Sequence, residues 1–198
     1  MHRTLEVKMK SLPLAVLGVT LVIALVQASN SNSFDLIIGC SQYNSVVQYH
    51  GAIKYFPTES MQNVRNTGYS KIFKIAILGP SDGHIRFGQS VFPTDSDGIE
   101  IVLGGWGNTK SAGRRQRRTG SRYSNVQLAE AQTPNLMSPY RPVMFELEVF
   151  NNGRVEVRRY GQSLPFLTFN DNNRTPVNYM AFAKWEKDLI FFYDCPSN

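Results

Sequence analysis

Residues 144–159 read Met-Phe-Glu-Leu-Glu-Val-Phe-Asn-Asn-Gly-Arg-Val-Glu-Val-Arg-Arg, and this stretch decides the fold class. Apolar side chains alternate with charged ones on both sides of Asn151-Asn152-Gly153. Strict alternation is typical of a β-strand with one buried face, and two such strands joined by a short Asn- and Gly-containing segment form an antiparallel hairpin. The stretch therefore predicts two paired strands with a turn at 151–153.

Patterns typical of strands recur along the rest of the chain, and no convincing helical period is present. Such runs occupy residues 48–56, 69–78, 83–87, 99–103, 124–131, 164–169, 178–182 and 189–193. Many short strands divided by Gly-, Pro- and Asn-rich turns predict an all-β fold, a single antiparallel β-sandwich or jelly-roll-like domain. The glutamates at alternate strand positions are interpreted as solvent-facing, in preference to a pair of glycosidase carboxylates. They are Glu100, Glu146, Glu148 and Glu156.

The first 28 residues have the organisation of a secretory signal peptide. Three basic residues precede an uncharged apolar run over 12–26, and small residues suited to a cleavage site follow up to Ala28. The run is short for a membrane-spanning helix, which needs roughly 20 residues, and no later run is longer. We therefore expect cleavage after Ala28 and a secreted single domain over residues 29–198, without a membrane span.

Composition and charge narrow the function classes. Of 198 residues 42% are hydrophobic and 18% are charged, which supplies a core and excludes a disordered chain. The net charge is +6, and loss of residues 1–28 leaves 18 basic and 14 acidic residues, a net charge of +4. Six basic residues lie between Lys110 and Arg122 without an acid among them. We interpret this segment as an exposed basic loop on a near-neutral body, which argues against a nucleic-acid partner.

The two cysteines, Cys40 and Cys195, lie near opposite ends of the mature chain. An oxidising compartment favours a disulfide between them, and two buried free thiols are the alternative. A metal site is not expected, because the cysteines and the mature histidines His50 and His84 show no ligand spacing such as CxxC or HxxxH.

Short motifs between residues 81 and 195 follow the order of one known family. They are Ser81-Asp82-Gly83-His84-Ile85, the run Ile99–Leu103 with Gly104-Gly105-Trp106-Gly107-Asn108-Thr109-Lys110-Ser111, Tyr140-Arg141-Pro142, Gly153-Arg154-Val155-Glu156-Val157, Pro165-Phe166 and Val177–Phe182. With them the chain resembles the farnesoic acid O-methyltransferase-like domain of invertebrate proteins. The resemblance implies methyl transfer from S-adenosylmethionine to the carboxylate of farnesoic acid, a step related to juvenile hormone synthesis.

The residues themselves favour a different function. Common methyltransferases hold the cofactor at a Gly-rich strand-to-helix turn, whereas Gly104–Gly107 runs into a basic segment with no helical pattern. We therefore expect no cofactor, no catalytic residues and a non-catalytic binding module. The alternative is an S-adenosylmethionine-dependent farnesoic acid O-methyltransferase.

Trp106 is the first candidate for ligand binding, because its glycine neighbours permit close approach to a sugar or a small apolar ligand. Asn108 and Arg114 are candidates for hydrogen bonds to that ligand. A tryptophan packed over the end of a sheet is the alternative interpretation.

The remaining candidates are surface features. Arg115, Arg117 and Arg118, together with Arg114, suggest a sulfated polysaccharide as partner, and the same arginines match the pattern that secretory convertases cleave. A solvated loop without a partner is the alternative. Asn173 begins an N-glycosylation sequon, although Pro176 directly after it disfavours its use.

Overall fold

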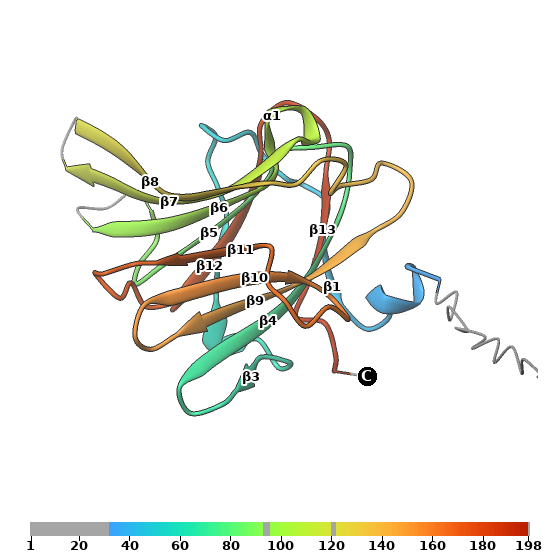
Figure 1. Cartoon of the computed structure of the whole chain (residues 1–198), viewed down its shortest axis with the longest axis horizontal. Helices are drawn as coiled ribbons and strands as arrows, with labels where there is room; N and C mark the ends of the chain where they lie inside the picture. The colour runs from blue at the N-terminus through green and yellow to red at the C-terminus, as the bar shows by residue number, and fades with distance from the viewer. Residues whose placement is uncertain (1–31, 93–95, 120–121, 198) are drawn as a thin grey trace, which may run out of the picture. The chain divides into compact units, whose positions relative to one another are not determined.

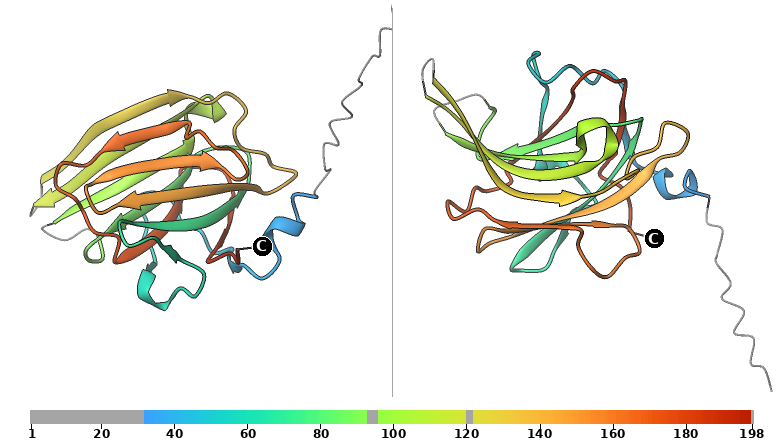
Figure 2. Two further views of the ribbon diagram at one scale, coloured as in Figure 1. Left: turned by 60° about the horizontal axis from the view of Figure 1, so that its bottom comes forward. Right: turned by 45° about the horizontal axis from the view of Figure 1, so that its top comes forward.

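The computed structural model describes residues 32–92, 96–119 and 122–197; the side chains of Arg118, Thr119 and Tyr123 are not described. The expected signal peptide, residues 1–28, lies outside the described residues. Two antiparallel sheets form the domain, as the sequence predicts, and Figures 1 and 2 show them as two stacked layers.

One sheet has seven strands in the order β1-β13-β4-β9-β10-β11, with β3 paired to β4. Their bounds are β1 (Ser41–Tyr43), β3 (Arg65–Asn66), β4 (Ser70–Leu78), β9 (Val143–Phe150), β10 (Arg154–Arg159), β11 (Leu167–Asn170) and β13 (Ile190–Tyr193). The hairpin that the sequence predicts is β9–β10, and Val155 pairs with Val149 across it.

The other sheet has six strands in the order β2-β12-β5-β6-β7-β8. Their bounds are β2 (Tyr55–Pro57), β5 (Gly83–Gly88), β6 (Asp97–Gly104), β7 (Lys110–Thr119), β8 (Arg122–Gln132) and β12 (Tyr179–Lys184). The described helices are single turns: η1 (Asp35–Ile37), η2 (Thr58–Ser60) and α1 (Gly105–Asn108). Among the described residues, no helix has the length and apolarity to cross a membrane.

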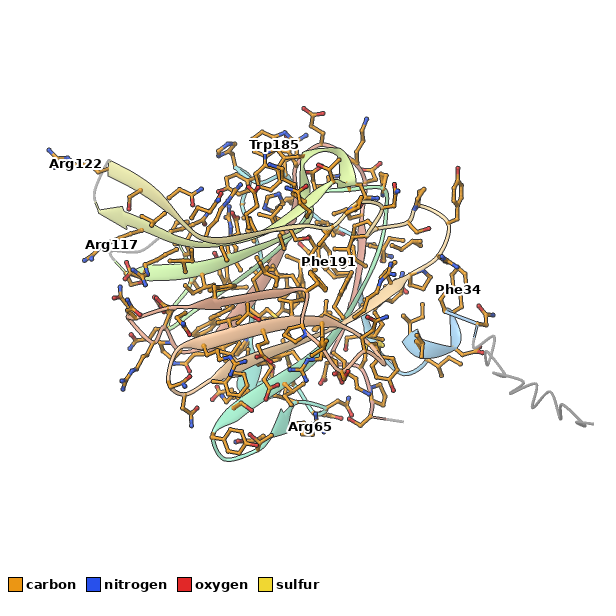
Figure 3. All side chains as sticks on the ribbon, in the orientation of Figure 1. Phe34, Arg65, Arg117, Arg122, Trp185 and Phe191 are labelled. Carbon is orange, nitrogen blue, oxygen red and sulfur yellow. A yellow bond between two sulfur atoms is a disulfide. The ribbon has the colours of Figure 1, made fainter. Side chains whose placement is uncertain are left out.

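The core lies between the two layers, where the apolar residues of each alternating strand meet. Phe191, labelled in Figure 3, stacks on Phe182 of the opposite sheet with 4.6 Å between ring centroids. Gly113 on β7 permits the two sheets to approach, because a Cβ atom there would lie 2.3 Å from the ring of Phe169. Burial of such side chains is the main stabilising term of the fold.

The predicted disulfide is confirmed: Cys40 and Cys195 are bonded, at a sequence separation of 155. The bond joins the segment before β1 to the segment after β13. These two strands pair at one edge of the seven-stranded sheet, with Ser41 opposite Tyr193. The disulfide therefore ties together the two ends of the described chain.

The prediction of an exposed basic loop at 110–122 is wrong. Residues 110–119 form β7, an interior strand between β6 and β8. Arg114 pairs in register with Glu100, and Arg115 binds Asp171. Arg114 and Arg115 are partly buried in this strand. Their charges are neutralised by Glu100 and Asp171, which are distant in sequence.

The interpretation of the glutamates as solvent-facing is wrong for three of them. Glu100, Glu148 and Glu156 are buried, and only Glu146 is partly exposed. Glu148 and Glu156 share the guanidinium of Arg158. Their side chains do leave the core face, but arginines and neighbouring segments cover them.

Candidate functional site

The turn between β6 and β7 projects Trp106 outward. Four of the five positions 104–108, all except Gly105, have left-handed dihedral angles: φ is 56° at Gly104, 53° at Trp106, 69° at Gly107 and 67° at Asn108. This conformation costs a bulky residue roughly 1–2 kcal/mol. Trp106 is nevertheless 45% exposed. Lys110 and Arg114 lie over part of the indole, and the rest of it is exposed, so packing over the end of the sheet describes only part of Trp106.

Hydrogen bonds on both sides of Trp106 fix this turn. Its backbone N–H donates to Oδ1 of Asp82 over 3.2 Å, and its carbonyl accepts from Oγ1 of Thr109 over 2.9 Å. The amide of Asn108 binds the backbone of Met137 twice, donating to the carbonyl and accepting from the N–H. The side-chain amide of Asn108 was predicted to bind a ligand. In the structure both of its polar atoms are used to hold the turn in place.

An open cleft of about 670 Å³ lies beside Trp106, on the outer side of the six-stranded sheet. Its second indole is Trp185, 47% exposed, in the segment between β12 and β13. Figure 3 shows Trp185 at the same end of the domain as α1. Tyr49 and His50 complete an aromatic wall, with their ring centroids 5.5 and 5.9 Å from that of Trp185.

A buried row of charged side chains lies next to the cleft, and Arg114 is its member that lines the cleft. Glu100 has no exposed surface, and its carboxylate lies 2.9 Å from Nε of Arg86 and 3.4 Å from NH1 of Arg114. These three residues are neighbours in one row across β5, β6 and β7. Burial alone would raise the pKa of Glu100, but the adjacent His84 and Arg86 outweigh burial and hold that pKa below its ordinary value.

His84 lies beside this row and lines the cleft. It is 3% exposed, and its Nδ1 is 3.3 Å from Oε1 of Glu100. Nδ1 therefore faces the carboxylate of Glu100, whereas Nε2 has no hydrogen-bond partner within the described residues. A buried polar atom without a partner is costly, so Nε2 is available to a bound molecule.

The sequence candidates separate into different parts of the structure. Trp106 and Arg114 come together at the cleft, where the guanidinium lies 5.2 Å from the indole centroid. Arg115 is bound to Asp171. Arg117 lies at the far end of the β7–β8 hairpin (Figure 3). Its Nε is 3.7 Å from Oδ1 of Asp97. The side chain of Arg118 is not described.

Asn173 is exposed in the segment after β11, and its side chain contacts Asp97. It is therefore accessible, although its glycosylation stays a prediction.

Sequence reasoning missed Tyr49, His50, His84 and Trp185 as residues of one site. The segment before β2 was predicted to be a strand from residue 48, yet the strand begins at Tyr55. Tyr49 instead lies over the guanidinium of Arg86, 4.2 Å from it, and its N–H donates to the carbonyl of Lys184. One available signal was that the chain has only two tryptophans, of which Trp185 is the second.

Three comparisons relate this chain to known proteins. Residues 49–197 match the profile of a family described as farnesoic acid O-methyltransferase. No curated protein matches the sequence significantly.

Solved structures resemble the fold only distantly. A β-glucanase of Bacillus licheniformis is 10% identical with a TM-score of 0.42, covering 69% of each chain. The carbohydrate recognition domain of Emp47p is 10% identical with a TM-score of 0.41, covering 79% of this chain and 91% of that one. Values this low say nothing about what this chain binds.

Proposed function

The chain belongs to the farnesoic acid O-methyltransferase family, and from this premise we propose that it is a secreted, non-catalytic module that binds a glycan in the cleft between Trp106 and Trp185. The indoles supply apolar faces for the C–H faces of sugar rings. Arg114 and His84, which line the cleft, supply hydrogen bonds to hydroxyl groups. A cleft with apolar walls and a few convergent polar groups is the usual form of a small-ligand site.

One observation carries the proposal: two half-exposed indoles line a single cleft, and one of them is held outward by a strained backbone. Strained residues persist where the surrounding structure imposes them, and they gather at functional sites. Packing accounts for only part of Trp106, because nearly half of its surface is exposed. Binding accounts for both the exposure and the strain.

The family name points to S-adenosylmethionine, and we tested whether the Gly-rich turn fits that cofactor. The familiar site places it at a turn from a strand into a helix. Here Gly104–Gly107 joins β6 to the antiparallel strand β7, and α1 has only four residues with non-helical angles at Trp106 and Gly107. This turn does not fit the cofactor in that mode, which favours binding over methyl transfer.

Secretion is supported by two features of different kinds. The first 28 residues have signal-peptide character. The disulfide Cys40–Cys195 is of a kind that persists in oxidising compartments. The proposed mature protein is the single domain over residues 29–198.

A glycan array followed by isothermal titration tests the proposal, using the secreted protein and the variants Trp106→Ala and Trp185→Ala. Tyr140→Ala is the matched control, because Tyr140 is 86% exposed and lies outside the cleft. We expect binding that both tryptophan variants lose and the control retains. Binding of S-adenosylmethionine with production of methyl farnesoate would instead establish the methyltransferase alternative.

A further inference from the structure

The charges beneath the cleft are unequal. Two guanidinium groups, Arg86 and Arg114, share the single carboxylate of Glu100. Arg86 takes the closer position at 2.9 Å, is buried, and is further covered by the ring of Tyr49. Glu100 is therefore mainly the counter-ion of Arg86.

Arg114 is left with a weaker partner and an open side. Its one ion pair among the described residues is the 3.4 Å contact with Glu100. One fifth of its side chain is exposed, and it lines the cleft next to the indole of Trp106. A guanidinium has five N–H donors in a planar fork, which suits a two-oxygen anionic group.

His84 is a second and independent sign of a polar ligand. Its ring is nine-tenths or more buried at the cleft. Nδ1 faces Glu100 at 3.3 Å, and Nε2 has no hydrogen-bond partner within the described part of the chain. A ligand oxygen or hydroxyl group at the cleft floor would remove this unsatisfied state.

Two acids also line the cleft, Asp82 and Glu186. Asp82 uses Oδ1 to hold the backbone N–H of Trp106. Glu186 is exposed and precedes Lys187, which lines the cleft as well. Within the part of the chain that the structure describes, neither acid forms an ion pair with Arg114, so an anion at the guanidinium does not displace them.

We propose, resting on the glycan-binding function above, that the cleft selects a glycan with an anionic substituent, a carboxylate or a sulfate, which Arg114 binds while His84 contacts a neighbouring polar atom of the same sugar. The sugar ring then lies against Trp106. Arg114 is thus the residue that determines specificity, and the tryptophans supply affinity for the ring.

The test is an array of oligosaccharides printed in matched sets, each neutral, carboxylated or sulfated on the same backbone, such as lactose, sialyllactose and sulfated lactose. We expect anionic members to bind at least about tenfold more tightly than neutral ones, as a charged hydrogen bond implies. The stronger of the two anionic arms identifies the substituent.

Three substitutions distinguish a specific role of Arg114 from a general effect of positive charge. Arg114→Gln should abolish the preference and retain weak neutral binding, whereas Arg117→Gln, at the remote end of the hairpin, should leave the preference intact. Arg114→Lys, which keeps the charge without the planar fork, serves if Arg114→Gln does not fold, and should reduce the preference.

Equal binding of neutral and anionic members would overturn this inference and leave the proposed function standing. Binding of no glycan on the array would overturn both. An unchanged preference in a folded Arg114→Gln or Arg114→Lys variant would place the anion elsewhere.

Discussion

Replacement of Glu100 by Gln should destabilise the domain strongly, although the change removes only a charge. Glu100 has no exposed surface and is the counter-ion of Arg86, which is itself buried. Removing one partner of a buried ion pair leaves an uncompensated charge and costs about 3–5 kcal/mol. For a domain of this size the melting temperature should fall by roughly 6–20 °C.

The pH dependence gives the same argument a second test. The pKa of Glu100 is lower in the folded protein than its ordinary value. A lowered carboxyl pKa contributes stability that is present above the unfolded pKa and is lost as the pH falls through the folded pKa. The difference in unfolding free energy between the wild type and Glu100→Gln should therefore be full at pH 7 and shrink below about pH 4.

Urea unfolding at several pH values measures both effects. Glu59→Gln is the control, because Glu59 is exposed and forms no ion pair among the described residues. The reasoning is refuted if Glu100→Gln costs less than about 1 kcal/mol at pH 7, the range expected for an exposed pair.

Three further predictions concern the turn, the disulfide and the sheet packing. Trp106→Gly should retain or raise the unfolding free energy, by up to about 1 kcal/mol, because glycine adopts the left-handed angle freely. Glycan titration of the same variant should show lost binding. A destabilised protein would contradict the strain argument. Reduction of Cys40–Cys195 should lower the unfolding free energy by about 4–5 kcal/mol, because the closed loop is long. Urea unfolding with and without reductant measures this as a shift of the midpoint, and an unchanged midpoint would be inconsistent with it. Gly113→Ala should cost about 1–3 kcal/mol in thermal or urea unfolding, because the new methyl group would collide with Phe169 and force the sheets apart; a neutral effect would show that the ring can move aside.

The sequence predicted most strands because their alternation records which side chains face the core. The β9–β10 hairpin is the clearest case. The arginine-rich strand β7 was missed because nothing local marks Arg114 and Arg115 as neutralised. Their partners, Glu100 and Asp171, lie 14 and 56 residues away.

The candidate site was only partly predictable for the same reason. Trp106 stands in a distinctive Gly-rich motif, so it could be found by inspection. Trp185, Tyr49 and His84 belong to three separate segments, and only the fold brings them to one cleft. Glu100 was expected to face solvent, but the segment containing Tyr49 covers its neighbours Arg86 and His84 on that face of the sheet.

Tryptophan fluorescence tests the central claim most directly, because the chain has two tryptophans and both line the cleft. The measurement is acrylamide quenching of the purified protein with and without a glycan that binds in titration. A glycan in the cleft should shift the emission and markedly reduce quenching. The effect should be half-maximal at a free glycan concentration equal to the dissociation constant found by titration. Glycan binding that leaves both the emission and the quenching unchanged would contradict the account, because the ligand would then lie away from Trp106 and Trp185.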